Sequence, residues 1–539
     1  MEIPSVGDPS HPILVYDTTL RDGSQGEGIL FSVEDKIRIA RRLDDLGVDF
    51  IEGGWPGANP KDSEFFRRAK QLNLRSGLVA FGSTRRSGVR AEEDVVLQGL
   101  LRAETRIVTV FGKAWDFHVT EALAIDGEKN LALIEDSIRY LKSRVDVVIF
   151  DAEHFFDGFK GNPEYALRVL GAARDGGADF LTLCDTNGGT MVSELGAIFG
   201  KTALRFPGTP LAIHCHDDCG LAVANSLMAV SLGAVQVQGT INGIGERCGN
   251  ANLTTIIPNL MLKMGRSTGI SQERLRSLQS LSRLVDELVN RSPRKDQPYV
   301  GMSAFAHKGG VHVSAVLKDG RTYEHIVPEQ VGNQRRILVS EQAGRSNLVA
   351  KLADYGILGV DPSDPRLQGL LGEIKDLENH GYQFDGAEAS FELRARRAMG
   401  EVPVYFETEG FRVIDERRSR GGDDKDMGAE ATVKVKVGQG QLHLVGEGAG
   451  PVDALHTALL KALEGAYPGV KNIRLADYKV RILRGGGTKA QVRVLVEWQD
   501  ETRQWSTVGV SDHIIAASYD AMVEAVNYKL FKDQAVPAQ

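Results

Sequence analysis

Cysteine is scarce in this sequence, and its few cysteines do not form a metal-binding pattern. The chain has 4 cysteines in 539 residues, at Cys184, Cys215, Cys219 and Cys248. Their spacings contain no C-x-x-C pair, and the C-H-x-x-C order from Cys215 to Cys219 would require ligands from opposite faces of one strand. We therefore expect reduced thiols in a cytoplasmic protein, and neither a zinc site nor a disulfide framework.

Signal-peptide, membrane-span and nucleic-acid-binding features are also missing. The start, Met1-Glu-Ile-Pro-Ser, lacks the basic and apolar regions of a signal peptide, and no apolar stretch approaches the length of a membrane span. Lys plus Arg number 64 against 72 Asp plus Glu, a net charge of −8 without a basic block. We expect neither a membrane nor a nucleic acid as partner, although arginine can still bind an anionic substrate locally. The length and the 42% hydrophobic content favour a globular protein of about three domains.

Short apolar runs alternate with longer helical patterns over the first 265 or so residues. Between the first two runs, Ser32-Val-Glu-Asp35 is typical of a capping box, and Gly47 ends a helical apolar pattern. Eight repeats over about 250 residues are typical of a (β/α)8 TIM barrel, whereas a doubly wound sheet more often stops at five or six strands. The eight runs are Ile13–Tyr16, Phe50–Gly53, Gly77–Phe81, Arg106–Phe111, Val145–Asp151, Phe180–Cys184, Leu211–His216 and Val235–Ile241.

Polar side chains that follow these runs indicate a metal site. His214 and His216 end the seventh run, and their spacing of two places both imidazoles on one face of a strand. Asp22 follows the first run, and the carboxyl ends of barrel strands meet at one mouth. Two imidazoles and a carboxylate with open positions are the ligands of a catalytic metal. Taken singly, the histidines are also compatible with a structural role, and Asp22 with a surface loop.

Three motifs resemble the signatures of the family of 2-isopropylmalate, homocitrate and citramalate synthases. They are Asp17-Thr-Thr-Leu-Arg-Asp-Gly-Ser-Gln25, His214-Cys-His-Asp-Asp-Cys-Gly-Leu-Ala-Val-Ala-Asn225 and Gly243-Ile-Gly-Glu-Arg-Cys-Gly-Asn-Ala251. The segments 52–57, 150–158 and 310–315 are most similar to the citramalate branch. The resemblance implies an acyltransferase that condenses acetyl-CoA, as co-substrate, with a 2-keto acid. For that branch the acceptor is pyruvate, and the product feeds isoleucine biosynthesis.

The resemblance also implies roles for individual residues. A divalent cation, with Mg²⁺, Mn²⁺ and Zn²⁺ as candidates, is expected on Asp22, His214 and His216, with Asn250 on or near it. Arg21 matches the catalytic arginine, and its guanidinium would stabilise negative charge in a way that lysine would not. Glu153 corresponds to the glutamate near the keto acid, and Thr186 to the hydroxyl that binds its carboxylate.

The proton acceptor for acetyl-CoA is expected outside the barrel. His312 aligns with the family histidine that reaches the active site from the partner subunit of a homodimer, and His307 competes for this role within the same motif. Histidine chemistry suits proton transfer near neutral pH.

Two segments depart from the isopropylmalate synthase pattern. Phe111-Gly-Lys-Ala-Trp-Asp-Phe-His118 lacks the expected small polar residues, and Asp151 stands where serine is usual. Both are expected near the keto acid, with Asp151 as a substrate-binding residue. They favour a smaller acceptor such as pyruvate over 2-ketoisovalerate, although one or two methyl groups give only modest discrimination.

The remainder of the chain predicts two further regions. After a barrel domain at 1–270, residues 271–400 have helical patterns without strand alternation and form a predicted helical linker. Residues 401–539 contain strand runs at 431–437, 480–483, 491–498 and 507–513 with two helices, a pseudo-symmetric α+β domain. It resembles the allosteric domain of the same synthases, with isoleucine as the implied effector. The alternative is a dimerisation module that has lost sensing.

Three other functions remain open at this point. The first is a 2-isopropylmalate synthase, with 2-ketoisovalerate as acceptor in leucine biosynthesis. The second is a metal-dependent acyl-CoA lyase of the same fold, which generally lacks the C-terminal module. The third is a non-catalytic binding protein on a decayed barrel, which the retained metal ligands and Arg21 disfavour.

Overall fold

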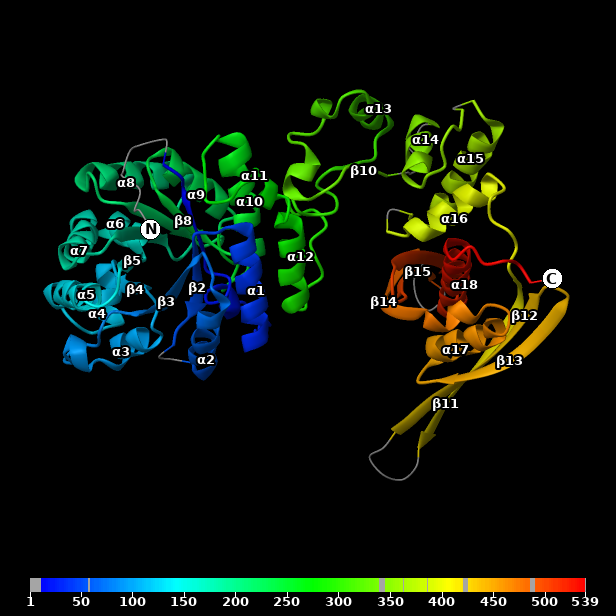
Figure 1. The fold of residues 1–539 in the computed structure, drawn as a ribbon, viewed down its shortest axis with the longest axis horizontal. Coiled ribbons are helices and arrows are strands. Elements are labelled where there is room, and N and C mark those ends of the chain that lie inside the picture. The colour runs from blue at the N-terminus through cyan, green and yellow to red at the C-terminus, as the bar shows by residue number, and fades with distance from the viewer. Residues whose placement is uncertain are drawn as a thin grey trace. The chain divides into compact units, whose positions relative to one another are not determined.

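A closed barrel of parallel strands forms the first half of the protein. The computed structural model describes residues 11–56, 59–338, 345–361, 363–384, 386–419, 425–484 and 490–538. Each strand pairs with the next in sequence and β8 pairs with β1, which closes the barrel (Figure 1). The predicted fold is confirmed. The strands are β1 (Leu14–Asp17), β2 (Phe50–Gly54), β3 (Gly77–Ser83), β4 (Ile107–Lys113), β5 (Val147–Glu153), β6 (Phe180–Asp185), β7 (Leu211–Cys215) and β8 (Gln236–Gly239).

Helices surround these strands as the periodicity predicts. The Ser32 side chain accepts a hydrogen bond from the Asp35 backbone and closes the predicted capping box, and Gly47 ends the helix with φ of 99°. The barrel helices are α1 (Val33–Leu46), α2 (Pro60–Ala69), α3 (Val95–Arg102), α4 (Asp116–Glu121), α5 (Gly127–Lys142), α6 (Phe155–Gly161), α7 (Pro163–Gly176), α8 (Val192–Arg205), α9 (Ala222–Ser231) and α10 (Leu253–Pro258).

The barrel interior is apolar toward the start of its strands. Tyr16, Phe50, Ile149 and Phe180 are fully or almost fully buried in a cluster that fills the barrel, while a larger core lies between strands and helices. With the start of the barrel filled, polar side chains collect at the carboxyl ends, the usual place of a TIM-barrel active site.

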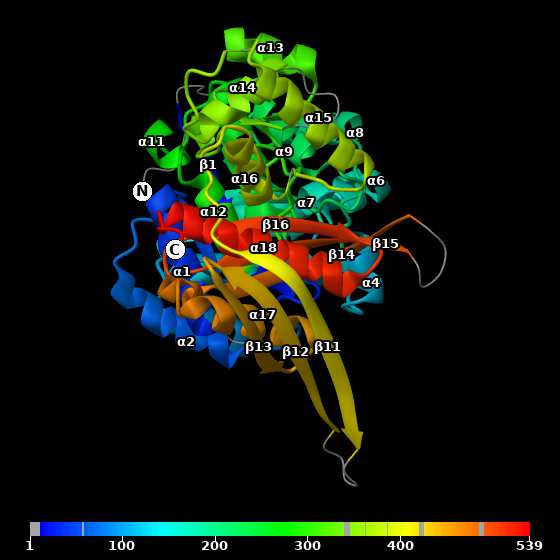
Figure 2. The ribbon, with the colours of Figure 1, turned by 90° about the vertical axis from the view of Figure 1, so that its right-hand side faces the viewer.

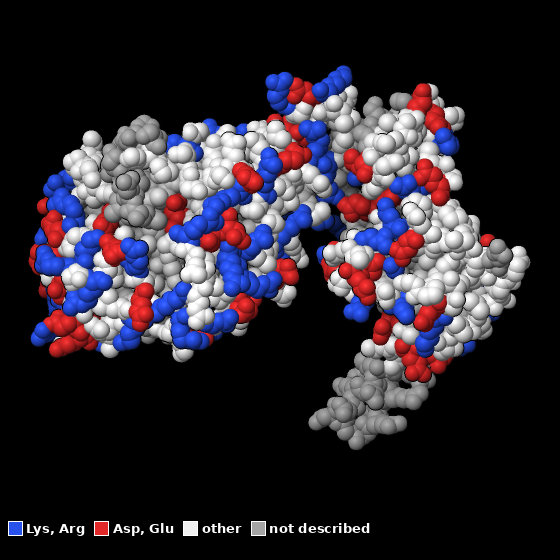
Figure 3. Space-filling model, in the orientation of Figure 1, with Lys and Arg blue, Asp and Glu red and all other residues white. Residues whose placement is uncertain are grey.

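The chain forms two compact units. Met1–Phe305 with Glu324–Arg335 is the barrel unit, and Ala306–Tyr323 with Arg336–Gln539 is the second unit. The barrel unit also contains α11 (Gln272–Leu275) and α12 (Leu278–Leu288), whose Leu278, Leu281 and Val285 are buried in the barrel core. On the face in Figure 3, acidic and basic side chains are interspersed over this unit.

The second unit begins with helices and a minimal sheet. Its helices are α13 (Gly310–Lys318), α14 (Arg345–Asp354), α15 (Pro365–Asn379) and α16 (Glu388–Ala398). The two-residue strands β9 (Ala306–His307) and β10 (Arg336–Ile337) pair in parallel. The expectation of no strand between 271 and 400 is wrong at these four residues, which are too few to produce an alternating pattern.

Two three-stranded antiparallel sheets, each followed by a helix, complete the second unit (Figure 2). The first repeat is β11 (Glu407–Ser419), β12 (Lys425–Val437), β13 (Gly440–Gly448) and α17 (Pro451–Glu464), and the second is β14 (Arg474–Arg484), β15 (Gln491–Gln499), β16 (Gln504–Ser511) and α18 (Ile514–Lys532). Both repeats contribute to one core, which includes Val433, Leu459, Val494 and Met522. The α+β class predicted for this region is confirmed.

Candidate active site

Asp22, His214 and His216 converge at the carboxyl end of the barrel. Asp22 follows β1, His214 lies in β7 and His216 directly follows it. Asp22 Oδ2 lies 3.5 Å from His214 Nε2 and 3.9 Å from His216 Nε2. One ligand atom from each residue lies within 4.8 Å of the others, and all three side chains are buried. The parallel strands of the barrel therefore bring together the three residues that were predicted to meet because each follows or ends an apolar run.

The residues at this site fit a divalent cation. Asp22 Oδ1 and Asn250 Oδ1 are buried and have no hydrogen-bond partner within the described part of the chain. A buried acceptor left unpaired costs about 1–3 kcal/mol, and a bound cation would remove that cost. Asn250 is placed beside the histidines by a bridge between its backbone and that of His216. Two imidazole nitrogens, a carboxylate and an amide oxygen form a mixed donor set with room for substrate oxygens.

Protonation at the site also favours metal binding. Burial opposes ionisation of Asp22, but the charges of Arg21, His214 and His216 prevail and lower its pKa to about 2. Burial lowers the pKa of His214 to about 4 and also lowers the pKa of His216. At neutral pH the aspartate is thus ionised and the imidazoles are neutral, the forms that bind metals.

Arg21 is held in place by three neighbours. Its Nε donates to Glu52 Oε1 at 2.5 Å, and its Nη1 lies 3.2 Å from Asp22 Oδ2. Its guanidinium carbon lies 3.8 Å from the centre of the Phe81 ring. The Tyr16 hydroxyl donates to the second oxygen of Glu52 at 2.6 Å. Neither Glu52 nor Tyr16 was assigned a role from the sequence.

Asp151 is also part of the barrel interior. It is 4% exposed, and burial raises its pKa to about 7. Its Oδ1 accepts a hydrogen bond from Gln238 Nε2 at 3.2 Å, and the Gln238 carbonyl oxygen lies 3.0 Å from His214 Nδ1. The structure thus connects Asp151 with the candidate metal ligand His214 through Gln238, which sequence reasoning missed. A polar residue inside an apolar strand run was the available signal.

Glu153 is the last residue of β5, and Thr186 directly follows the neighbouring strand β6 at the same mouth. Glu153 Oε2 lies 2.5 Å from Lys113 Nζ. The Thr186 hydroxyl oxygen accepts a hydrogen bond from the His154 backbone at 2.8 Å, which leaves its own proton for another acceptor.

His312 belongs to the other compact unit. It lies in α13, is exposed, and stacks on Tyr323 with ring centres 4.2 Å apart. His307 lies in β9 of the same unit and is buried. Both histidines therefore belong to the unit that does not contain the barrel residues.

An aromatic wall formed by Trp55, Phe81 and Phe111 lies beside Arg21. Phe81 and Phe111 stack with ring centres 5.4 Å apart, and Trp55 meets both rings edge-on. Phe111 is the first residue of the segment in which the sequence departs from the isopropylmalate synthase pattern. Large rings at this position reduce the space beside the arginine.

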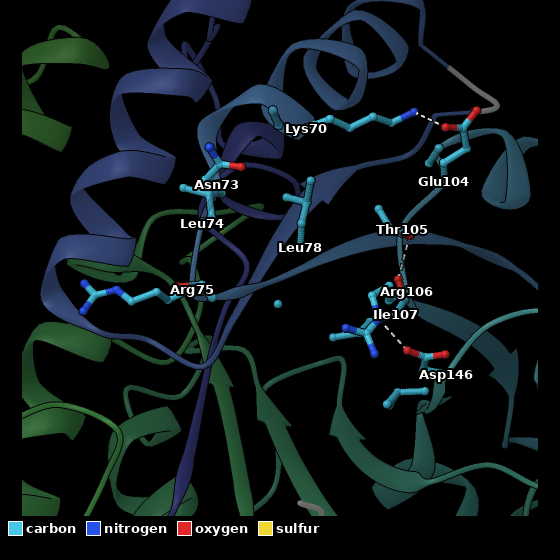
Figure 4. A pocket seen from close by; sticks show the side chains of 15 residues that line it. Lys70, Asn73, Leu74, Arg75, Leu78, Glu104, Thr105, Arg106, Ile107 and Asp146 are labelled. Atoms are coloured by element: carbon cyan, nitrogen blue, oxygen red, sulfur yellow. Dashed lines mark hydrogen bonds and ion pairs between the residues drawn. The ribbon is translucent and has the colours of Figure 1, made fainter. Parts of the chain in front are cut away.

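A cavity of about 740 Å³ lies at the opposite end of the barrel, where β3, β4 and β5 begin (Figure 4). Lys70 Nζ pairs with Glu104 Oε2 at 2.6 Å, and Arg106 Nε with Asp146 Oδ2 at 2.5 Å. Charges in this cavity are thus compensated, and it lies away from the candidate metal ligands.

None of the helices in the described part of the chain combines the length and the hydropathy of a membrane span.

Three protein families match successive parts of the chain. The HMGL-like family matches residues 13–282, the homocitrate synthase post-HMGL domain-like family matches 299–382, and the LeuA allosteric (dimerisation) domain matches 385–530. The chain belongs to the HMGL-like family, whose barrel is metal-dependent.

Relatives that match the whole chain define the branch. The (R)-citramalate synthases of Aquifex aeolicus and Geobacter sulfurreducens are each 55% identical to it, over 97% of this chain and 98% of theirs. The (R)-citramalate synthase of Streptomyces coelicolor is 47% identical over 97% of this chain and 98% of its own length. Within the HMGL-like family, the chain thus belongs to the (R)-citramalate synthase branch.

Proposed function

We propose that this protein is an (R)-citramalate synthase, which condenses acetyl-CoA and pyruvate with water to give (R)-citramalate and free CoA. The observation that carries this proposal is the 55% identity to (R)-citramalate synthases over nearly the full length of both chains. The proposal includes a cytoplasmic location and a role in isoleucine biosynthesis. It assigns the chemistry to a barrel domain at 1–270, the linker to 271–400 and regulation to 401–539.

Asp22, His214 and His216 would hold a divalent cation, with Asn250 as a further ligand, and Mg²⁺, Mn²⁺ and Zn²⁺ are the candidates. When bound, the cation would supply Lewis acidity that polarises the keto group of pyruvate. The unpaired Asp22 and Asn250 oxygens support this assignment.

Arg21 is the proposed catalytic residue that stabilises negative charge on the substrate oxygen as the new C–C bond forms. Glu52 and Phe81 restrict its guanidinium to one orientation, so little reorganisation is needed when charge develops. Glu153, Asp151 and Thr186 are the proposed contacts to the keto acid, and the free Thr186 hydroxyl proton suits a carboxylate acceptor.

His312 is the proposed base that removes a proton from the methyl group of acetyl-CoA. Its assignment rests on the motif and requires α13 of a partner subunit, in agreement with the match to a dimerisation domain. Water then hydrolyses the thioester bond of the condensation product, which releases CoA and leaves the second carboxylate of citramalate.

The aromatic wall supports pyruvate as the acceptor. The Phe81 ring lies against Arg21 and Phe111 stacks on Phe81, so a longer acceptor side chain beside the arginine would have to displace a ring. The C-terminal domain disfavours the lyase alternative, and we propose that it binds isoleucine in a homodimer.

The test is CoA release, followed with a thiol reagent, from acetyl-CoA plus pyruvate, 2-ketobutyrate, 2-ketoisovalerate or 2-ketoglutarate. We expect a preference for pyruvate with Mg²⁺ or Mn²⁺, and loss of activity with a chelator. A preference for 2-ketoisovalerate would identify an isopropylmalate synthase instead. Absence of release with every keto acid would overturn the synthase proposal.

A further inference from the structure

Gln238 is a buried glutamine that lies beside a candidate metal ligand. It belongs to β8, and the register of the barrel pairs it with His214 of β7. Its side chain is fully buried inside the barrel. Most buried side-chain amides form hydrogen bonds, and the amide of Gln238 has a partner at each end.

The two ends of the Gln238 amide contact different partners. Oε1 lies 3.0 Å from His214 Nδ1. Nε2 donates to Asp151 Oδ1 at 3.2 Å and to Thr182 Oγ1 at 3.2 Å. In its ionised form the Asp151 carboxylate can only accept, so it selects the orientation in which the amide NH₂ faces it. The amide carbonyl then faces His214, and a carbonyl oxygen can only accept.

This orientation specifies the tautomer of His214. A neutral imidazole has one N–H and one lone pair, and the Gln238 carbonyl places the proton on Nδ1. The lone pair then lies on Nε2, the nitrogen that faces Asp22 at 3.5 Å. If the amide were reversed, its NH₂ would favour the other tautomer, with a proton on Nε2 where a cation would bind.

We propose that Gln238, oriented by Asp151 and Thr182, is a positioning residue that fixes the metal-binding tautomer of His214. This inference rests on the proposed function, since it assumes that Asp22, His214 and His216 bind a cation. It assigns Asp151 a role in the metal centre besides the contact with the keto acid. Partners that orient a metal-binding histidine typically change metal affinity by about 10–100-fold when removed.

Gln236 provides a matched control in the same strand. It lies two residues before Gln238 on the same face, is fully buried, and pairs in register with Ala212 instead of His214. Neither atom of its amide has a hydrogen-bond partner among the described residues. The same substitution at both positions therefore removes a buried amide from the same strand, but only at Gln238 does it remove an orienting hydrogen bond.

The experiment measures Mn²⁺ affinity of the full-length protein by electron paramagnetic resonance of free Mn²⁺, with folding checked by circular dichroism. We expect Gln238→Met to weaken Mn²⁺ binding about 10–100-fold and Gln236→Met to leave it within about twofold of the unmodified protein. Nitrogen-15 NMR of labelled histidine should show loss of the single Nδ1–H tautomer of His214 in Gln238→Met only.

A double variant tests whether the orientation of the His214 imidazole, and not the packing around position 238, determines Mn²⁺ affinity. In the double variant Gln238→Glu with Asp151→Asn, a carboxylate still accepts from His214 Nδ1–H, and an amide NH₂ faces it from position 151. We expect this variant to bind Mn²⁺ more tightly than Gln238→Met, and this rescue would support orientation of the imidazole.

Two kinds of result from the Mn²⁺ measurements would contradict this inference. Unchanged Mn²⁺ affinity in folded Gln238→Met, or equal losses in Gln238→Met and Gln236→Met, would overturn the positioning role while the proposed function stands. Absence of Mn²⁺ binding by the unmodified protein would overturn the metal site itself, and this inference with it.

Discussion

Glu52 Oε1 lies 2.5 Å from Arg21 Nε, and the hydroxyl of Tyr16 donates to the other oxygen of the same carboxylate. The carboxylate is fully buried, so its charge is balanced mainly by the arginine. One buried acid thus fixes both the orientation and the charge environment of the proposed catalytic guanidinium. A charge-assisted hydrogen bond of this kind has a strict geometry, and its loss would let the guanidinium rotate.

The first prediction concerns this contact. Glu52→Gln retains the shape of the side chain but removes its charge, so we expect kcat for CoA release to fall about 10–100-fold, because a small misplacement of a catalytic group is costly. The KM for acetyl-CoA should change little. Steady-state kinetics with pyruvate measures both constants.

Glu64→Gln is the control for this prediction. Glu64 also pairs with an arginine, Arg67, at 2.6 Å, but both side chains are largely exposed. An exposed pair contributes little, so kcat should be unchanged. Equal activity of Glu52→Gln and the unmodified protein would show that Arg21 does not depend on Glu52.

The candidate metal ligands were easier to predict from the sequence than Gln238, which contacts one of them. Asp22, His214 and His216 were predictable because the ends of parallel strands must meet at one mouth. Gln238 was not, because its partners Asp151 and His214 come from other strands and its role depends on register. The strand pattern of a buried barrel gives the order of the strands but not which side chains meet across the interior.

In the C-terminal domain, the sequence predicts some strands and misses others. Residues 431–437 of β12 alternate clearly because one face is buried, and this strand was predicted. β13, at Gly440–Gly448, was not predicted: it is exposed at most positions, and its polar–apolar alternation covers only Gln441 to Leu444. β11 continues to Ser419 and β12 begins at Lys425, while 420–424 lie outside the described residues.

The second prediction concerns the cation. Asp22→Asn removes the only carboxylate of the three-residue group, so we expect Mn²⁺ affinity to fall by more than about 100-fold, beyond the effect of removing an orienting partner. CoA release should fall to background, as it should in the unmodified protein treated with a chelator, and Mn²⁺ should restore activity in the unmodified protein alone.

Asp45→Asn, on an exposed position of α1, serves as the comparison for charge removal. Its metal affinity and activity should equal those of the unmodified protein. Full activity of Asp22→Asn in the presence of chelator would exclude this site as the catalytic centre.

The third prediction concerns the aromatic wall. Phe111→Ala removes a ring that stacks on Phe81, and the added space should favour 2-ketobutyrate over pyruvate. One methylene is worth about 10-fold or somewhat more in discrimination. We therefore expect the ratio of kcat/KM for 2-ketobutyrate to that for pyruvate to rise about 10-fold.

Phe117→Ala removes a ring of the same size from a position that is 53% exposed. In this control variant, the ratio of kcat/KM for 2-ketobutyrate to that for pyruvate should stay constant. A constant ratio in Phe111→Ala as well would mean that specificity is determined elsewhere in the pocket.

The fourth prediction concerns stability and pH. Asp49 Oδ2 accepts a hydrogen bond from the Val15 backbone at 2.8 Å, and burial raises the pKa of Asp49 to about 6. The folded state thus binds this proton more tightly than the unfolded state, whose pKa is near 3.8. The resulting destabilisation is absent below pH 4, grows between pH 4 and 6, and is complete above pH 6.

Asp49→Asn keeps an oxygen acceptor for Val15 but has no charge to bury. It should therefore raise the free energy of unfolding by about 1–3 kcal/mol at pH 8 and change it little at pH 4. Urea unfolding of the full-length protein at both pH values gives this difference.

Asp179→Asn tests whether the buried charge itself is responsible. Asp179 Oδ2 accepts from the Val148 backbone at 2.8 Å, the same arrangement at the start of β5, but it also pairs with Lys142 Nζ at 2.7 Å. Neutralising Asp179 removes an attraction that Asp49 does not have, so Asp179→Asn should not stabilise the protein at pH 8. Equal stabilisation by both substitutions would show that the backbone geometry at strand starts, and not an unpaired carboxylate, controls the pH dependence.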